Sequence, residues 1–178
     1  MKGVVFNILE EVVVDAHGED IWDEFLEKAG VNGAYTSLGN YSDDELTTLV
    51  ETAASATDMT AGEFLRWFGE RALPRLRDRY PVLFEDCRSG RSLILSVNSF
   101  IHPEVRKLYA GASCPFFHLN ETPRGVIMGY QSSRRMCDLA HGFVNGVAHL
   151  FDERIDVEHR KCMNKGDERC LMELSWLS

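Results

Sequence analysis

The 178-residue sequence predicts a single α+β domain, in which a helical N-terminal part precedes an antiparallel four-stranded sheet and one long helix. Two observations predict this class. Apolar residues recur at helical spacing through about residues 1–112, and over about residues 113–178 short strand-like runs alternate with turn residues. The sequence has no internal repeat and no Pro/Ser-rich linker, so we expect one folding unit over residues 1–178.

The first eighty residues are expected to form four amphipathic helices. The first ends near Gly18 and the second at Gly30, although the valines of the first would also suit a strand. Ser42–Glu45 and Thr60–Glu63 have the capping-box pattern, in which a hydroxyl and a carboxylate bind free backbone N–H groups at a helix start. Pro74 is expected to end or kink the fourth helix, because proline cannot donate a backbone hydrogen bond.

Residues 92–110 are expected to form a further buried helix. Pro103 lies inside this segment, and a proline within a helix costs about 3 kcal/mol. It therefore marks either the start of a helix or a local kink beside His102. The apolar positions that predict the helix are Leu93, Val97, Ile101, Val105 and Leu108.

The last third of the sequence predicts two hairpins with a helix between them. A turn signal at residues 121–125 separates the first two runs, and Asn164–Asp167 separates the last two. A long helix fits about residues 134–150, since its apolar residues share one face. The strand-like runs cover residues 116–119, 126–130, 155–159 and 170–174.

Composition and charge exclude several classes of protein. No apolar run approaches the roughly 20 residues of a membrane-spanning helix, and the first residues lack a secretory cleavage site. Five cysteines are an odd number, which argues against a disulfide scaffold and favours a reducing cytoplasm. The net charge of −9 makes nucleic acid a poor partner.

Two groups of residues are candidates for binding chemistry. His102 lies within an apolar pattern, and a neutral imidazole in an apolar pocket suits an axial iron ligand, although such a histidine is more often a core residue. Tyr130, Ser132 and Arg134 alternate where a strand is expected to give way to a helix, so they would share one face and bind a carboxylate or phosphate. The alternative is a helix N-cap by Ser132 or Ser133 with a surface arginine.

In combination, these groups resemble the haem-nitric oxide/oxygen binding family, the sensor domains related to soluble guanylate cyclase. The resemblance covers the chain from residue 1 to its end. It implies haem b as cofactor, with His102 as the proximal ligand of the iron and the tyrosine, serine and arginine of the motif bound to the haem propionates. Pro115 would press against the porphyrin. The matching residues are Met1-Lys2-Gly3, His102 to Tyr109, Pro115, Tyr130, Ser132 and Arg134.

The resemblance also indicates which gas is bound. Oxygen-binding members carry a distal tyrosine nine residues after the motif tyrosine, and this position is Leu139 here. The neighbouring distal positions are expected to be Leu9 and Ala72, which are also without hydrogen-bond donors. Bound dioxygen needs a donor, whereas nitric oxide and carbon monoxide need one much less. An apolar distal pocket therefore predicts selectivity for nitric oxide over oxygen.

The mechanism implied by the resemblance is ligand-driven. Nitric oxide would break the bond between iron and His102, release the helix that carries this residue and let the N-terminal helices shift. The sequence has no enzyme-like set of catalytic residues, and stand-alone members act on a histidine kinase or a diguanylate cyclase, so we expect a non-catalytic cytoplasmic sensor with such a partner. The alternative is a haem-free effector-binding domain with structural zinc, in which the motif at Tyr130 holds the effector's carboxylate.

A cysteine and histidine cluster is expected near the C-terminus. The spacing places two thiols and an imidazole across the last hairpin, and a third thiol comes from the long helix, which together suit a closed tetrahedral zinc site. A similar cluster occurs in one subgroup of the resembling family. Zinc would be structural, and oxidation of the thiolates would be a second input; the alternative is a group of metal-free thiols. The expected ligands are Cys137, His159, Cys162 and Cys170.

Overall fold

The computed structural model describes residues 1–177 and confirms the α+β class. Short 3-10 turns follow α4 and β3, and a π-helical turn separates α5 from α6. The helices are α1 (Gly3–His17), α2 (Glu19–Ala29), α3 (Asp43–Ala56), α4 (Ala61–Arg79), α5 (Gly90–Ser96), α6 (His102–Leu108) and α7 (Cys137–Leu150). The strands are β1 (Phe117–Thr122), β2 (Gly125–Tyr130), β3 (Arg154–Lys161) and β4 (Cys170–Leu177).

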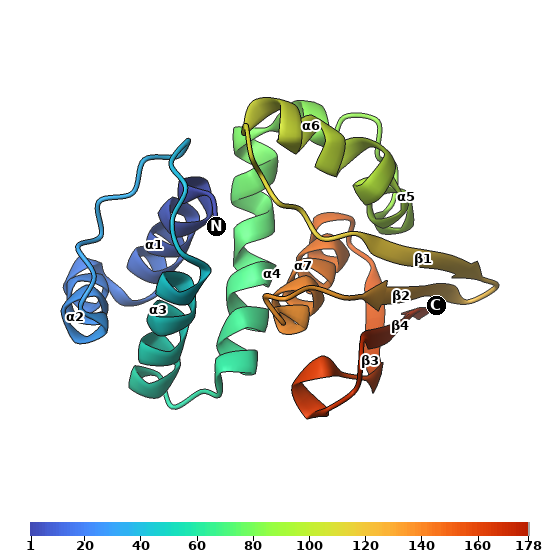
Figure 1. Cartoon of the computed structure of the whole chain (residues 1–178). Helices are drawn as coiled ribbons and strands as arrows, with labels where there is room; N and C mark the ends of the chain where they lie inside the picture. Colours follow the sequence, from blue (N-terminus) through green and yellow to red (C-terminus); the bar gives the residue numbers. More distant parts are fainter. Residues whose placement is uncertain (178) are drawn as a thin grey trace.

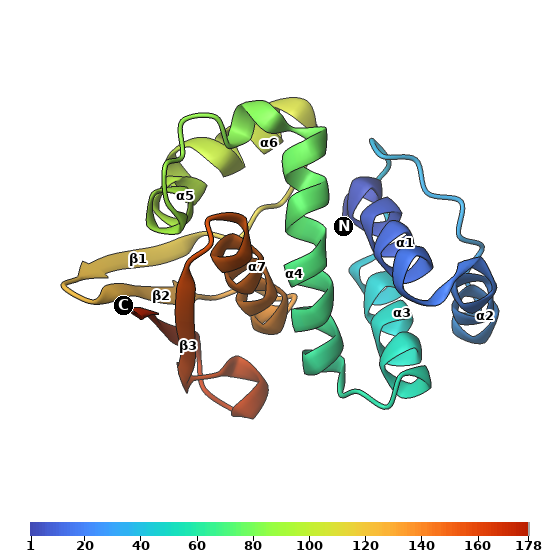
Figure 2. The same ribbon diagram turned by 180° about the vertical axis from the view of Figure 1, so that it is seen from behind.

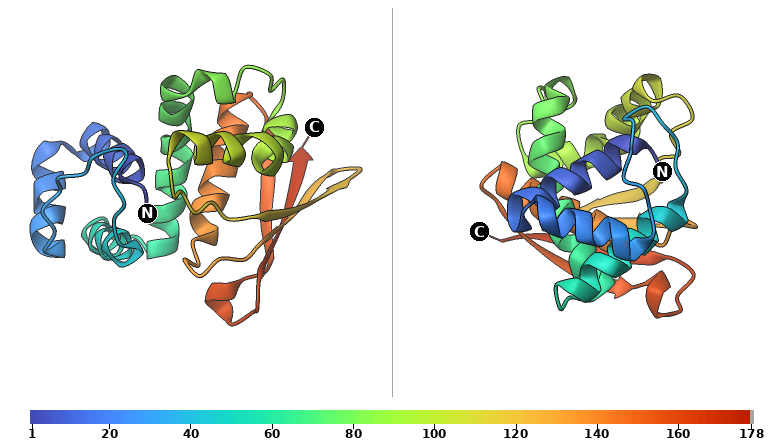
Figure 3. Two further views of the ribbon diagram at one scale, coloured as in Figure 1. Left: turned by 45° about the horizontal axis from the view of Figure 1, so that its top comes forward. Right: turned by 90° about the vertical axis from the view of Figure 1, so that its left-hand side faces the viewer.

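Helix α4 divides the molecule into two parts. Figures 1 and 2 show α1, α2 and α3 on one side of α4, with α7 and the sheet on the other. The segment α5–α6 lies at one end of α4, above α7 in Figure 1, and Figure 3 shows it from two further directions. The helical side has its own core, whose largest fully buried side chains are Phe6, Phe25, Phe64 and Phe68.

The expected helix starts are found, with one change in their chemistry. Thr60 and Glu63 form a complete capping box, because each side chain bonds to the other residue's backbone. Ser42 caps α3, but its hydroxyl accepts the N–H of Asp44 at 3.1 Å. The carboxylate of Glu45 instead accepts the Tyr35 hydroxyl at 2.7 Å. The predicted capping box is therefore incomplete, because Glu45 bonds to the Tyr35 side chain and not to the backbone of Ser42.

Helices α4 and α7 approach closely through glycines. A Cβ atom at Gly142 would lie 2.3 Å from the Arg66 carbonyl oxygen, and one at Gly69 would lie 2.7 Å from the Leu139 carbonyl oxygen. Pro74 was expected to end or kink α4, and it does not end it, since the helix continues to Arg79. A glycine contributes here too. In a regular helix the Glu70 carbonyl would accept the N–H of residue 74, which proline lacks. This carbonyl faces Gly146, where a Cβ atom would lie 2.8 Å from it.

The segment expected as one helix over residues 92–110 is divided. It forms α5, a π-helical turn at Val97–Ile101, and α6, which has Pro103 in its first turn. Proline is accommodated there because the first turn of a helix has N–H groups without helical partners. The wider π turn lets the chain continue without the missing donor.

The sheet confirms both expected hairpins. Its order is β1-β2-β4-β3, and each neighbouring pair is antiparallel. Helix α7 packs on one face and completes a second core, which includes Val126, Met128, Val144 and Met172. Strand β1 is an edge strand, so the backbone groups on its outer side need partners from outside the sheet.

Candidate functional site

A mostly apolar cavity of about 370 Å³ lies between the two parts of the molecule. Its wall is formed by α1, α4 and α7, by the segment α5–α6, and by the first hairpin. Polar side chains are confined to a few positions, which include His102, Tyr130, Ser132 and Arg134. A concave apolar site with few convergent polar groups is the usual form of a small-molecule or cofactor pocket.

His102 opens α6 and lines this cavity. Burial, followed by the charge of Arg106, lowers the pKa of its imidazole to about 4, so the ring is neutral near pH 7. The backbone of Pro115 is near enough to oppose this shift in part, yet the buried Nδ1 atom makes no hydrogen bond. A neutral imidazole that keeps a ring nitrogen without a hydrogen-bond partner is suited to metal coordination.

Pro115 also lines the cavity, on the extended segment that leads from α6 into β1. The structure therefore places His102 and Pro115 on the same cavity, as the sequence predicts. The Phe117 ring lies two residues further on, with its centroid 5.9 Å from that of His102 and 5.7 Å from that of Tyr130. This phenylalanine connects the two predicted groups of residues.

The tyrosine, serine and arginine of the motif are brought together at one edge of the cavity. The Tyr130 hydroxyl accepts the Met136 N–H at 3.1 Å, and the Ser132 hydroxyl accepts the Arg134 N–H at 3.3 Å. Each hydroxyl accepts in these bonds and keeps its own proton to donate. Helix α7 has no side-chain cap, so the alternative of a serine N-cap is not found.

Arg134 is fixed from two directions. Its Nε donates to Asp43 at 2.8 Å, and its Nη1 donates to the Ser113 carbonyl at 2.5 Å. Asp43 is the first residue of α3, and Arg134 follows β2. The guanidinium thus links the helical side to the sheet side at the cavity edge, where a ligand carboxylate would find a positive charge.

The wall contributed by α1, α4 and α7 is entirely apolar among the described residues. It includes Leu139 but not Leu9 or Ala72. Both residues are 1% exposed and lie within the helical core. Their places at the cavity are taken by Val5, one turn before Leu9, and by Leu73, because a step of one residue rotates a helix position by about 100°.

Some cavity residues were not singled out from the sequence. Phe143 lines the cavity one turn after Leu139, and this helical spacing could have indicated it. The Tyr80 hydroxyl bonds to that of Tyr109, and both tyrosines line the cavity. Burial and this bond raise the pKa of Tyr80. No local pattern pairs these two residues, since they follow α4 and α6.

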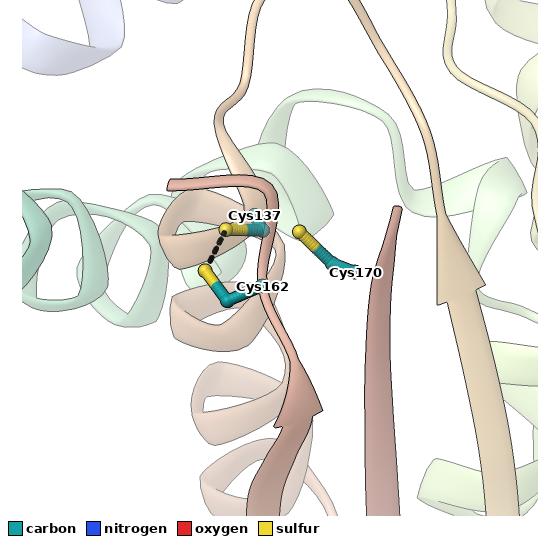
Figure 4. A group of neighbouring side chains, drawn as sticks. All are labelled: Cys137, Cys162 and Cys170. Carbon is teal, nitrogen blue, oxygen red and sulfur yellow. Dashed lines mark hydrogen bonds between the residues drawn. The ribbon is translucent and has the colours of Figure 1, made fainter. Parts of the chain in front are cut away.

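The three predicted thiols come together where α7 begins and where the chain turns from β3 to β4, as Figure 4 shows. The sulfur atoms of Cys137, Cys162 and Cys170 all lie within 4.8 Å of one another, with 3.7 Å between Cys137 and Cys162. All three residues are buried. Burial raises the pKa of Cys137 and of Cys170, so without a metal these groups are held as thiols.

His159 does not join this thiol cluster. Its Nε2 lies 3.0 Å from Nδ1 of His141, and the two rings stack with centroids 5.2 Å apart. Burial lowers the pKa of both histidines, to about 4 for His141. The structure therefore brings together three of the four predicted ligands, because β3 directs His159 toward α7 one turn beyond Cys137.

The described residues contain no helix that is both long and apolar enough to cross a membrane. Comparison with known families matches residues 2–159 to the haem-NO-binding family. An H-NOX protein from S. oneidensis in the Fe(II)NO ligation state is similar over 100% of both chains, at 30% identity and a TM-score of 0.94. The NMR structure of the Shewanella oneidensis H-NOX domain in the Fe(II)CO state matches with a TM-score of 0.91 at 30% identity, covering 100% of this chain and 99% of that one. An unliganded Fe(II) H-NOX protein from K. algicida matches at 26% identity and a TM-score of 0.89, covering 100% and 97%.

Proposed function

The chain belongs to the haem-NO-binding family of gas sensors, and on this basis we propose that it binds nitric oxide at ferrous haem b and regulates a separate signalling protein. Carbon monoxide would bind to the same site. The observation that carries the proposal is the cavity, in which the unpaired imidazole of His102 faces an apolar space with three hydrogen-bonding side chains at its edge.

The residues of the cavity fit a haem. His102 offers a neutral ring nitrogen for the iron, and Tyr130, Ser132 and Arg134 offer two hydroxyls and a guanidinium for the two propionates. The apolar wall suits the macrocycle, against which Pro115 would press. Haem would supply the ferrous iron that binds the gas. The protein holds this group and excludes water from it.

Selectivity for nitric oxide over oxygen follows from the wall of α1, α4 and α7. Bound dioxygen carries partial negative charge and is retained by a hydrogen-bond donor, whereas nitric oxide needs none. Val5, Leu73 and Leu139 on this wall have no N–H or O–H group. The hydroxyls of Tyr80 and Tyr109 bond to each other, and both residues lie after α4 and α6 rather than on this wall.

Absorption spectroscopy of the His102→Ala variant tests the haem proposal. The wild-type chain expressed with haem supply should show a Soret band that shifts with nitric oxide and carbon monoxide but not with air, and the variant should lose it. The matched control is His118→Ala, which removes an exposed histidine outside the cavity. A normal ferrous spectrum in His102→Ala would refute the ligand assignment. Colourless wild-type protein would support the haem-free effector-binding alternative.

For the output, we propose a cytoplasmic histidine kinase or diguanylate cyclase as the partner. The chain itself would be non-catalytic, so its signal would be a change of surface on gas binding. Kinase or cyclase activity measured with unliganded and with nitric oxide-bound protein tests this proposal. Equal activity in both states for each enzyme class would contradict it.

We propose further that Cys137, Cys162 and Cys170 hold a structural zinc ion. Three sulfur atoms within 4.8 Å suit a tetrahedral site, and a bound cation would reverse the effect of burial on the thiol pKa values. His159 would complete the ligand set by leaving His141. Metal analysis of protein purified without chelator should give about one zinc per chain. His159→Ala should weaken zinc retention more than His149→Ala, an exposed control on α7; zinc below half an equivalent would refute the site.

A further inference from the structure

Asn98 joins the segment that carries His102 to the first strand. It lies in the π-helical turn before α6, and its side chain makes two hydrogen bonds with one residue, Phe117. Nδ2 donates to the Phe117 carbonyl at 2.5 Å, and Oδ1 accepts the Phe117 N–H at 3.1 Å. The amide therefore pairs with the edge of β1 as a neighbouring strand would.

The position of Phe117 in the sheet explains why both of its backbone groups are free to bond to the Asn98 amide. Phe117 is opposite Tyr130 in the β1–β2 register, and its N–H and C=O both point to Asn98, so this pair is of the non-hydrogen-bonded type. Because β1 is an edge strand, these two groups have no partner within the sheet. The π turn brings Asn98 to them.

The two bonds secure a segment with little other packing. Neither the π turn nor α6 has a buried residue, in contrast to α4 and α7. Among the described residues, the other hydrogen bond between residues 97–108 and 113–122 joins the His102 imidazole to the Pro115 backbone. Phe117 in turn contacts the rings of His102 and Tyr130, and the segment just before it carries Pro115.

We propose that Asn98 is a positioning residue that holds the His102 helix against the Pro115–Phe117 segment and limits how readily this helix is released. This inference rests on the proposed function of His102. Asn98 does not line the cavity and would not touch the haem. Its role would be to set the position of the imidazole, whose own Nδ1 makes no hydrogen bond.

The test compares Asn98→Leu, which keeps the branched shape and removes both bonds, with the haem-loaded wild type. Amide exchange by NMR should show about tenfold faster exchange at Phe117. Resonance Raman should show a lower iron–histidine stretching frequency, and stopped-flow absorption should show about tenfold faster loss of the iron–histidine bond with nitric oxide. Ser99→Ala, an exposed neighbour in the same turn, is the control and should match wild type.

The outcomes separate the possible failures. Faster exchange at Phe117 with an unchanged iron–histidine stretching frequency and unchanged nitric oxide kinetics would overturn the positioning role. Unchanged exchange at Phe117 would show that the two Asn98 hydrogen bonds do not secure this segment. If Asn98→Leu fails to fold, Asn98→Asp, which keeps the acceptor and loses the donor, is measured in the same way with the same criteria. Absence of a Soret band in the wild type would contradict the proposed function and this inference with it, whereas a haem-loaded variant that behaves as wild type contradicts the inference alone.

Discussion

The two helical walls of the cavity are built in different ways. On one side, α4 and α7 approach through Gly69 and Gly142 so closely that backbone touches backbone. On the other side, α6 is a short helix without a buried residue, preceded by a π turn. The α4–α7 wall is close-packed, whereas α6 is held by a few contacts. We therefore expect ligand binding to move α6 rather than α4 and α7.

The ion pairs of these two parts also differ in burial. Away from the cavity, α4 and α7 are joined by an ion pair in which Arg66 Nη2 lies 2.6 Å from Asp138, whose side chain is 11% exposed. Helix α6 has the exposed pair of Lys107 and Glu104 at 2.5 Å, and exposed pairs contribute little to stability. We expect substitutions to cost much on the first wall and little on the second.

The largest effect is expected from Gly142→Ala on the close-packed wall. The added Cβ would lie 2.3 Å from the Arg66 carbonyl oxygen, and backbone on both helices would have to move. The free energy of unfolding should fall by about 3 kcal/mol. Urea denaturation measures this, with the exposed α7 variant His149→Ala as the control. A change as small as the control's would show that the two walls do not differ in packing.

A smaller loss is expected from Arg66→Ala. Removing this partner leaves the Asp138 carboxylate buried without a counter-charge, which costs up to about 5 kcal/mol for fully buried pairs. Because Arg66 is 42% exposed, we expect a loss of about 2 kcal/mol, measured by urea denaturation. Arg160→Ala, whose ion pairs are half exposed, should lower the free energy of unfolding much less than Arg66→Ala does. Equal costs would refute the role of burial.

Leu139→Tyr tests the chemistry of the close-packed wall. It would place a hydroxyl donor on an otherwise apolar surface, so the dioxygen affinity of the haem-loaded protein should rise at least about tenfold. Leu139→Phe adds the ring without the hydroxyl and is the matched control. Spectra recorded under nitrogen and in air measure the difference. The same dioxygen affinity in both variants would mean that polarity on this wall does not decide gas selectivity.

The smallest effect is expected from Leu108→Ala on α6. The side chain is 51% exposed, and surface substitutions change stability by less than about 0.5 kcal/mol. Urea denaturation beside Gly142→Ala gives the direct contrast between the walls. A loss above about 1.5 kcal/mol would show that α6 is packed as firmly as α7.

Local signals predicted most of the fold. The Thr60 capping box, the two hairpins and the long helix at 137–150 depend on bonds and sterics within a few residues, and all are found. The motif residues also lie where the sequence predicts, on one cavity. Pro74 does not end α4, which was one of its two expected effects, and the space beside its missing hydrogen bond comes from Gly146 on another helix.

By itself, the sequence determined most of the elements, the residue types of the site and the place of two thiols at the last hairpin, because spacing within one helix or hairpin decides which side chains share a face. Only the tertiary structure decided which faces meet. It turned Val5 and Leu73 rather than Leu9 and Ala72 toward the cavity, and it paired His159 with His141. The physical reason is that glycine contacts between α4 and α7 set the rotation and approach of these helices, and no local pattern records the position of a partner helix.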